Sequence, residues 1–405
     1  VVVNADGFFI GVTTPAYPNL FFFNGYCAHQ IYSSASGSSI RGNYIGTRAD
    51  GSGTLGNGLS GIYLQGGAFN HTIGGTAANQ GNLIVGNGGD GVWVGATAGA
   101  GNAILGNTIY SNTGLAIDLG ANGVTANDTN DGDSGANDLL NFPIVTKVVQ
   151  NGANLDVTLV LDVPAGNYRI ELYQNPAGID STRYGEGQVF LGALSVTSTG
   201  TGAQTFTGTL TSVTATSITR ISATATRDLG AGTYRSTSEF GPRAGLVVST
   251  TADNLDGTTS SVSALILNPG ADGLISLREA ITAANASAGT DYIYFDITAA
   301  LVGGVHTITL AYDGADAGTT PDALPIITSP VVINGWTEPD YAGTPIIELN
   351  GNNVAGAKGL ELGAGSSGST IKGLIINRFT GTGIEISGAS NNHTIQGNWI
   401  GLNAA

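Results

Sequence analysis

A glycine–asparagine pair recurs along this chain at the spacing that stacked structural repeats require. Among its occurrences are Gly42-Asn43, Gly86-Asn87, Gly106-Asn107 and Gly397-Asn398. The first three of these are separated by 44 and 20 residues, and Gly373 precedes Gly397 by 24 residues. One coil of a β-solenoid takes roughly 20–29 residues, so the 44-residue interval is interpreted as two coils. The pattern therefore predicts short strands wound into stacked coils.

Glycine and asparagine suit the sharp corners that such a winding needs. Glycine reaches positive φ at no steric cost, and asparagine is one of the few other residues that tolerate it. Stacked asparagine side chains can also hydrogen-bond to one another along the axis. Gly accounts for 64 of the 405 residues and has no three-residue period, which excludes a collagen helix. Hydrophobic residues make up 41%, which argues against disorder.

The charge balance excludes several classes of partner. Lys and Arg number 13 against 29 Asp and Glu, which gives a net charge of −16. So few cations cannot form the basic stripe that neutralises nucleic-acid phosphates, and the same shortage disfavours an anionic membrane surface. No apolar run is long enough to span a bilayer. The single Cys27 excludes an intramolecular disulfide, and the absence of Met leads us to expect a trimmed chain or an excerpt of a longer one.

Three segments differ in the pattern of their apolar residues. In 1–138, short apolar runs alternate with Gly/Asn turns, and a period of two places Ile62 and Leu64 on one inward face. In 139–245, longer alternating strands rich in Thr, Val and Tyr predict an antiparallel β-sandwich. In 246–405, short runs resume after a capping segment. We therefore predict late coils, a sandwich, and the early coils of a second or the next solenoid.

One short helix is predicted near 276–285, in the sequence SLREAITAAN. Ser276 and Glu279 have the spacing of a capping box. The apolar residues at helical spacing are Leu277, Ala280, Ile281 and Ala284. A helix at this place would cover an open coil end, where backbone groups are otherwise unpaired.

The same region carries a resemblance to a known family. DGLISLREAITAAN (272–285), followed by PVVINGW, STIKGLIINRFTGTGIEI and NNHTIQGNWIGLNAA, resembles secreted bacterial proteins in which a CSLREA domain leads into right-handed parallel β-helix repeats. Segments 42–64 and 109–143 look like later coils of such helices, and 171–192 with 235–242 is similar to the β-sandwich that follows them. Ile275 stands where the family has its namesake cysteine, and residues 1–41 match least.

The resemblance implies an all-β fold, with right-handed parallel β-helix segments at both ends separated by an antiparallel Ig-like β-sandwich, and one short capping helix near 276–285. The order is unusual, because the cap and early coils come last and the late coils come first. Joined end to start, they would make one complete module. We therefore expect one period of an array, formed by tandem repeats or by copies stacked head to tail through open β-helix ends.

Acidic residues that recur at the spacing of one coil would lie next to each other on successive coils, so they are the candidates for catalysis. Glycoside hydrolysis needs two carboxylates about 5–9.5 Å apart. Glu361 and Glu385 are 24 residues apart and could stack, although charges on a solvated coil face are the favoured interpretation, and Glu348 is expected to point outward in the same way. Asp118 is interpreted as isolated, and His71 and His393 as equivalent turn residues. Asp313, Asp316 and Asp322 fall in a loop where solvation or a loose cation site is expected.

One acidic loop is a candidate cation site. Oxygen ligands gather between 127 and 138, around Gly132 and Gly135. Ca²⁺ takes 6–8 oxygen ligands from flexible loops, but the spacing departs from the EF-hand pattern, so a solvated loop is the alternative. The candidate ligands are Asp128, Asn130, Asp131, Asp133 and Asp138, with Asn137 beside them. A weaker second candidate is formed by Asp253, Asp256 and Asp272.

The sequence favours a structural function. We expect a non-catalytic, extracellular module of a bacterial cell surface that assembles into a filament, sheath or rod, and such a module could also be adhesive. Its partners would be copies of itself and, if it is adhesive, surface polysaccharide. No cofactor is required, and Ca²⁺ is the one candidate. The alternative is a polysaccharide-active or carbohydrate-binding protein that uses exposed aromatics such as Trp93, Trp336 and Trp399.

Overall fold

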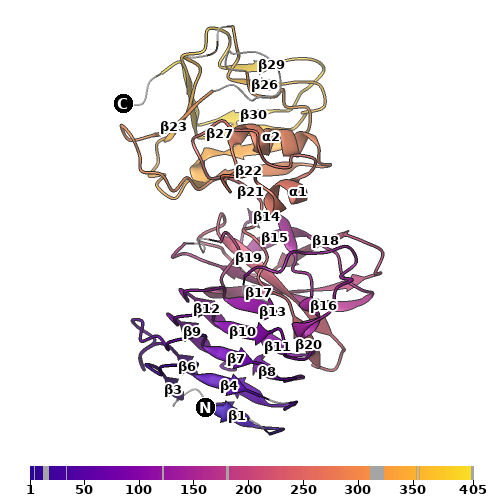
Figure 1. Cartoon of the computed structure of the whole chain (residues 1–405). Helices are drawn as coiled ribbons and strands as arrows, with labels where there is room; N and C mark the ends of the chain where they lie inside the picture. Colours follow the sequence, from indigo (N-terminus) through magenta and orange to yellow (C-terminus); the bar gives the residue numbers. More distant parts are fainter. Residues whose placement is uncertain are drawn as a thin grey trace. The chain divides into compact units, whose positions relative to one another are not determined.

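The computed structural model shows an all-β chain organised in two compact units, Val1–Arg243 and Ala244–Ala405 (Figure 1). It describes residues 1–405 except 4, 12–17, 33, 121–122, 179–181, 311–322, 353, 355 and 403–405. Each unit is considered by itself. Among the described residues, no helix combines the length and apolar character that crossing a membrane requires.

Three parallel sheets make up the first part of the first unit. The first sheet contains β1 (Val2–Val3), β4 (His29–Ile31), β7 (Ile62–Leu64), β10 (Val92–Gly95) and β13 (Ile117–Gly120). The second contains β2 (Phe9–Gly11), β5 (Ser39–Arg41), β8 (Thr72–Gly74) and β11 (Ala103–Leu105), and the third contains β3 (Leu20–Phe21), β6 (Tyr44–Ile45), β9 (Leu83–Val85) and β12 (Thr108–Tyr110). Every strand pairs with the third strand after it, so the chain passes through the three sheets in rotation. One such circuit is called a coil below.

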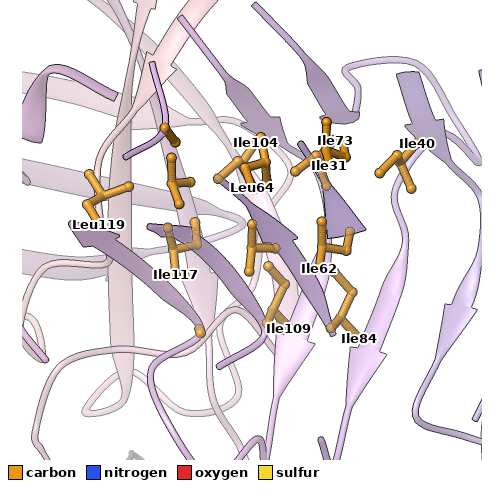
Figure 2. Close-up of a cluster of buried hydrophobic side chains, with 14 of the residues drawn as sticks. Ile31, Ile40, Ile62, Leu64, Ile73, Ile84, Ile104, Ile109, Ile117 and Leu119 are labelled. Carbon is orange, nitrogen blue, oxygen red and sulfur yellow. The ribbon is translucent and has the colours of Figure 1, made fainter. Parts of the chain in front are cut away.

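Aliphatic side chains fill the space that the three sheets enclose. The pairing register places aliphatic residues of successive coils next to one another: Ile62 lies beside Val92, and Val92 lies beside Ile117. Ile62 and Leu64 are both fully buried, which confirms the predicted inward alternation. Figure 2 shows this cluster, with Ile40, Ile73 and Ile104 contributed by the second sheet and Ile84 and Ile109 by the third. A single coil could not bury such a face, so stacking is what removes it from water.

Asparagine side chains form two hydrogen-bonded ladders at the coil corners. At the corner between the second and third sheets, Asn43 Nδ2 donates to Asn82 Oδ1 (3.0 Å), and Asn82 Nδ2 donates to Asn107 Oδ1 (2.9 Å). At the corner that leads back to the first sheet, the corresponding residues are Asn57, Asn87 and Asn112, joined at 2.8 Å and 2.8 Å. All six side chains are buried. The predicted bonding along the axis is therefore confirmed.

The interpretation of the 44-residue interval as two coils was wrong. Asn43 and Asn87 belong to different ladders, so the interval from Gly42 to Gly86 combines one coil with the step to another corner. The 24-residue interval from Gly373 to Gly397 does equal one coil, because Lys372 lies beside Gln396 in neighbouring strands. The Gly-Asn pair occurs at two different corners of the coil: the corner between the second and third sheets, and the corner between the third and first sheets.

Two antiparallel sheets complete the first unit. One contains β14 (Ile144–Asn151), β15 (Asn154–Leu161) and β18 (Gln204–Leu210), and the other contains β17 (Val189–Ser198), β16 (Gly166–Gln174), β19 (Ile221–Asp228) and β20 (Tyr234–Thr237). Alternating residues such as Val157, Leu159, Ile170 and Leu172 are buried. These sheets share one compact unit with the preceding coils. The division into domains 1–138, 139–245 and 246–405 stays a prediction.

The second unit returns to parallel pairing. Its first sheet contains β21 (Leu246–Val248), β22 (Asp291–Phe295), β24 (Val331–Asn334), β27 (Thr370–Lys372) and β30 (Thr394–Gln396). The second contains β23 (His306–Thr309), β25 (Ile347–Asn350), β28 (Leu374–Asn377) and β31 (Trp399–Ile400), and the third contains β26 (Leu360–Leu362) and β29 (Ile384–Ile386). From β26 onward the chain visits the three sheets in rotation, as in the first unit.

The predicted helix is α2 (Leu277–Asn285), and its capping box is present. Ser276 Oγ accepts from the Glu279 amide (3.1 Å), and Glu279 Oε2 accepts from the Ser276 amide (2.9 Å). The apolar stripe is buried, and α2 contacts β21 and β22. Ile275 is buried too, at the position of the family's cysteine. A second short helix, α1 (Val262–Leu267), was not predicted from the sequence, although Ser261 caps it through the Ala264 amide.

Candidate functional site

The last coil of the first unit is closed by polar groups from the antiparallel sheets. Its strands β11, β12 and β13 are the last in their sheets and present amide groups that no further coil bonds. The Ile104 amide donates to Thr237 Oγ1 (2.8 Å), and the Gly106 amide donates to Glu171 Oε2 (2.8 Å). On the third sheet, Ile109 and Gly187 exchange backbone hydrogen bonds of 2.9 and 2.8 Å. An open sheet edge invites pairing with another chain, and here each of the three edges is covered.

Glu239 covers the edge of the first sheet and is buried. It accepts from the amides of Leu119 and Thr125, both at 2.9 Å. Burial, together with the charge of neighbouring Asp118, raises the pKa of Glu239 to about 8. Burial also raises the pKa of Asp118 to about 7. Asp118 was therefore wrongly interpreted as isolated, because Glu239, 121 positions later in the chain, interacts with its charge.

The first coil of the second unit is closed by α2 and its flanking loop. Glu279 Oε1 accepts from the amides of Asp256 (3.0 Å) and Gly257 (2.7 Å), which fixes the loop on the helix. Buried Arg278 forms an ion pair with buried Asp253, with 2.6 Å between Nη2 and Oδ2. Asp256 instead accepts from the Ala271 amide, and Asp272 from Asn254 and Leu274. The structure does not bring the three acids of this second cation candidate together.

The opposite end of each stack exposes apolar side chains. In the first unit, β1, β2 and β3 are edge strands, and the core positions Ile10 and Phe21, which lie beside buried Ile40 and Ile45, are only partly buried. Val2 (68% exposed), Phe9 (49%) and Phe23 (70%) are further exposed apolar residues at this end. In the second unit, β29, β30 and β31 are edge strands, and Ile386 (53%), Ile395 (40%) and Ile400 (46%) lie on them. Their register partners in the preceding coil are fully buried, namely Leu362, Ile371 and Ile376. Each unit therefore has one covered end and one end with the surface of an interrupted core.

Part of the predicted calcium loop converges. Asp128, Asp131 and Asp133 each place one carboxylate oxygen within 4.8 Å of the others. Asp128 also accepts from the Gly132 amide (3.0 Å), and Asp131 accepts from the Asn141 amide (2.7 Å). The pKa of Asp131 is raised to about 7. Burial is the main cause, and the neighbouring acids Asp133, Asp128 and Asp138 contribute. Carboxylates this close together repel one another when they are charged, and a bound cation would offset that repulsion.

The other predicted ligands of this loop have different roles. Asp138 Oδ2 accepts from Ser236 Oγ at 2.5 Å. Asn137 is fully buried, where it bonds the Asn102 amide (2.7 Å) and donates to the carbonyls of Asn102 and Thr237. The role of Asn130 as a ligand stays a prediction. Three of the predicted carboxylates thus converge, and Asn137 belongs to the closure of the coil stack.

The two glutamates at coil spacing stack, but a lysine joins them. Glu361 lies beside Glu385 in β26 and β29. Lys358 Nζ lies 2.8 Å from Glu361 and 2.7 Å from Glu385, and hydrogen bonds from Lys358 and Ser387 lower the pKa of Glu361. Glu348 lies beside Thr307, on the strand face opposite the core residue Leu349, but the expectation that its charge is solvated was wrong. It is buried and accepts from Thr307 Oγ1 and Asn377 Nδ2, both at 2.7 Å.

The histidines differ in their surroundings. His71 is buried at a corner, where its Nδ1 accepts from the Ser38 amide (3.2 Å), while His393 is partly exposed before β30. His306 is buried in a group with Glu338 and Asp340 that sequence reasoning missed, because 32 residues separate His306 from Glu338. Asp313, Asp316 and Asp322 lie outside the described residues.

The aromatic residues named for sugar binding are only partly exposed. Trp93 stacks on Tyr63 of the preceding coil, with ring centroids 4.2 Å apart and an interplanar angle of 9°. Trp336 packs against Lys372, whose Nζ lies 4.8 Å from the ring centroid. A separate open cleft of about 550 Å³ in the first unit is lined by Phe69, Asn70, Asp138, Arg227 and Arg235, among others.

Comparison with known proteins adds no assignment. No protein-family model matches this chain, and no curated protein matches it.

Proposed function

We propose that this chain is a non-catalytic structural module that extends by stacking coil upon coil. In this proposal, the parallel sheets are right-handed β-helix segments and the antiparallel sheets form an Ig-like β-sandwich. The observation that carries it is the contrast between the ends of each stack. One end is closed by buried polar groups such as Glu239 and Glu279, while the other exposes aliphatic and aromatic side chains. Exposed contiguous apolar surface of this kind marks a contact site.

The two open ends offer matching registers. Gly397-Asn398 lies between β30 and β31, as Gly42-Asn43 lies between β5 and β6. Asn398 Nδ2 donates to the Ile371 carbonyl (2.8 Å), as Asn82 Nδ2 donates to the Ile40 carbonyl (2.8 Å). In the first unit, each ladder asparagine donates to the asparagine of the following coil. The ladder begins at Asn19, whose Nδ2 donates to Asn43 Oδ1 (2.9 Å). Asn398 would accordingly donate to Asn19 of a second copy or a tandem repeat.

Such a contact joins unlike surfaces and does not close, so it produces a filament or rod. The extracellular, bacterial-surface setting rests on the resemblance of 272–285 and the following coils to secreted proteins. The absence of catalysis is supported at Glu361, because its hydrogen bond from Lys358 lowers its pKa while a general acid needs a raised pKa. The neutral Asn ladders and low charge content suit a rigid rod.

A cysteine pair tests the proposed contact directly. Adjacent coils lie roughly 4.8 Å apart, which a disulfide can bridge. We expect the double variant Asn19→Cys/Asn398→Cys to form a ladder of covalent multimers on oxidation, seen on a non-reducing gel. The matched control is Asn151→Cys/Asn398→Cys, because Asn151 is exposed in the antiparallel part. Equal multimer formation by both pairs, or none by the first, would refute the contact.

A charge at the open end tests assembly without crosslinking. Ile395→Asp places a carboxylate among the apolar residues of β30, while Val302→Asp changes an exposed residue (79%) of the same unit away from the edge strands. We expect concentration-dependent assemblies in sedimentation and electron microscopy for the unchanged chain and Val302→Asp, but not for Ile395→Asp. A monomer at high concentration for the unchanged chain would count against the filament.

One observation supports carbohydrate binding as a second candidate. The stacked Tyr63–Trp93 pair presents two aromatic rings on neighbouring coils of one sheet face, beside Gln30. Sugar rings bind such platforms through apolar faces with polar groups nearby. A screen of the chain against immobilised polysaccharides, with Trp93→Ala as the comparison, tests it. Retention that the Trp93→Ala substitution does not reduce would exclude this face as the binding site.

A further inference from the structure

His306 is a buried side chain without a described hydrogen-bond partner. It begins β23, where its backbone amide donates to the Ile346 carbonyl (2.8 Å) and fixes the strand on β25. Its side chain is only 1% exposed. Within the part of the chain that the structure describes, neither Nδ1 nor Nε2 has a hydrogen-bond partner. Leaving a buried polar group without a hydrogen-bond partner is destabilising, so such a group calls for a ligand.

Two carboxylates face this imidazole from the segment after the short helix η2 (Gly335–Thr337). Glu338 is buried, and its Oε2 accepts from the Ile297 amide (3.0 Å), which fixes the carboxylate. Its Oε1 lies 3.8 Å from His306 Nε2, which is too long for a hydrogen bond. Asp340 is exposed, and one ligand atom from each of the three side chains lies within 4.8 Å of the others.

We propose that His306, Glu338 and Asp340 bind a divalent transition-metal ion of the zinc class. Tetrahedral Zn²⁺ lies about 2.0–2.2 Å from imidazole nitrogen and carboxylate oxygen, which places two of its ligand atoms about 3.3–3.6 Å apart. The 3.8 Å between His306 Nε2 and Glu338 Oε1 is slightly longer, so a small side-chain movement brings both atoms onto one ion. Imidazole suits Zn²⁺, Ni²⁺ and Cu²⁺, whereas Ca²⁺ and Mg²⁺ prefer sets made only of oxygen.

The surroundings suit a site that is half enclosed. The His306 ring is buried and both of its nitrogens lack a hydrogen-bond partner among the described residues, so a nitrogen is available to a metal ion. Exposed Asp340 places the third ligand at the surface, which leaves a path for the ion and a position for water. The ion would tie the 338–340 segment to β23, which is an edge strand of its sheet. The expected consequence is local stabilisation of the second unit.

The test uses the full chain stripped of metal with a chelator and titrated calorimetrically with Zn²⁺ and, separately, with Ca²⁺. We expect one Zn²⁺ per chain at this site, with a rise in melting temperature, and no Ca²⁺ at this site. Asp340→Asn changes an exposed position, so the fold should be kept, and it should weaken Zn²⁺ binding by at least the roughly 10–100-fold that loss of an outer-shell partner costs. His306→Asn should abolish it. Asp131→Asn, in the acidic loop of the other unit, is the matched control.

A spectroscopic readout separates this site from incidental surface binding. Co²⁺ added to the metal-free chain should give visible absorption bands of a mixed nitrogen and oxygen set, and Asp340→Asn should change them while Asp131→Asn does not. Unchanged Zn²⁺ affinity in Asp340→Asn, an equal loss in Asp131→Asn, or no Zn²⁺ binding by the unchanged chain would each overturn the proposal.

Discussion

The asparagine ladder offers the sharpest test of what holds the coils in register. Asn82 is 1% exposed and lies in the middle of its ladder. Its Oδ1 accepts from the amide and the Nδ2 of Asn43, both at 3.0 Å. Its Nδ2 donates to the Ile40 carbonyl (2.8 Å) and to Asn107 Oδ1 (2.9 Å). An amide side chain has two donor hydrogens and two acceptor lone pairs, so all of the bonding capacity of Asn82 is used.

Asn82→Ala removes these four bonds together. Each contributes about 0.5–1.5 kcal/mol net, and the partners left behind stay buried. Asn43 Nδ2 keeps its bond to the Ile10 carbonyl, which limits the loss. We therefore expect the free energy of unfolding to fall by about 2–4 kcal/mol. Asn82→Asp keeps the shape but points an oxygen at two acceptors, Ile40 O and Asn107 Oδ1, so we expect a loss at least as large.

Guanidinium chloride unfolding, followed by circular dichroism, measures these changes. The control is Asn151→Ala, because Asn151 is exposed and bonds only Asp156 through its side chain among the described contacts. Surface changes of that kind stay within about 0.5 kcal/mol. If Asn82→Ala matched Asn151→Ala, or if Asn82→Asp were as stable as the unchanged chain, the ladder would be a by-product of stacking and the reasoning would fail.

Three further predictions concern the closure, the acidic loop and a buried histidine. Glu239→Ala should lower the free energy of unfolding by about 2–4 kcal/mol, because two buried amides lose their acceptor. Glu385→Ala, at a partly exposed position of the other unit, should change it little, and unfolding curves measure both. Calorimetry should show Ca²⁺ binding at pH 8, and the affinity should fall as the pH is lowered through about 7, the pKa of Asp131, because this carboxylate becomes protonated. Asp131→Asn should remove the binding. The absence of binding heat at pH 8 would end the calcium hypothesis. Burial lowers the pKa of His29 from 6.5 to about 3, so its contribution to stability is complete above pH 6.5 and is lost as the pH falls towards 3, by about 4–5 kcal/mol in total. His29→Leu should flatten that part of the profile of stability against pH, and an unchanged profile would contradict the assignment.

Local signals were readable from the sequence, and contacts between distant segments were not. The capping box of Ser276 and Glu279 depends on four consecutive residues, so its pattern identified α2 correctly. Hydrogen bonding between stacked asparagines was predicted because sharp corners favour glycine and asparagine, which recur along the sequence. By contrast, Asp118 meets Glu239 only because the antiparallel sheets close the last coil. The burial of Glu348 was missed because it depends on partners in two other coils, Thr307 and Asn377.

The same limit explains why His306, Glu338 and Asp340 escaped notice. Nothing near His306 in the sequence resembles a ligand motif, and Glu338 reaches it only after the intervening chain has completed part of a circuit. Asp128, Asp131 and Asp133 were predicted because they are neighbours in one loop. Asn137 and Asp138 belong to the same loop by sequence, but their partners Asn102, Thr237 and Ser236 come from other elements.

Coil length varies here without disturbing the stack, and the ladders account for this. From Asn43 to Asn82 the chain takes 39 residues, but from Asn82 to Asn107 only 25. Ile45, Ile84 and Ile109 nevertheless lie in direct register across the three coils. The additional residues lie in loops outside the strands, where lengthening costs little because closure entropy grows only slowly with loop length. Bonded corners and stacked isoleucines therefore set the rise from coil to coil, and the number of residues between them does not, which is why a repeat length taken from sequence intervals misassigned the 44-residue step.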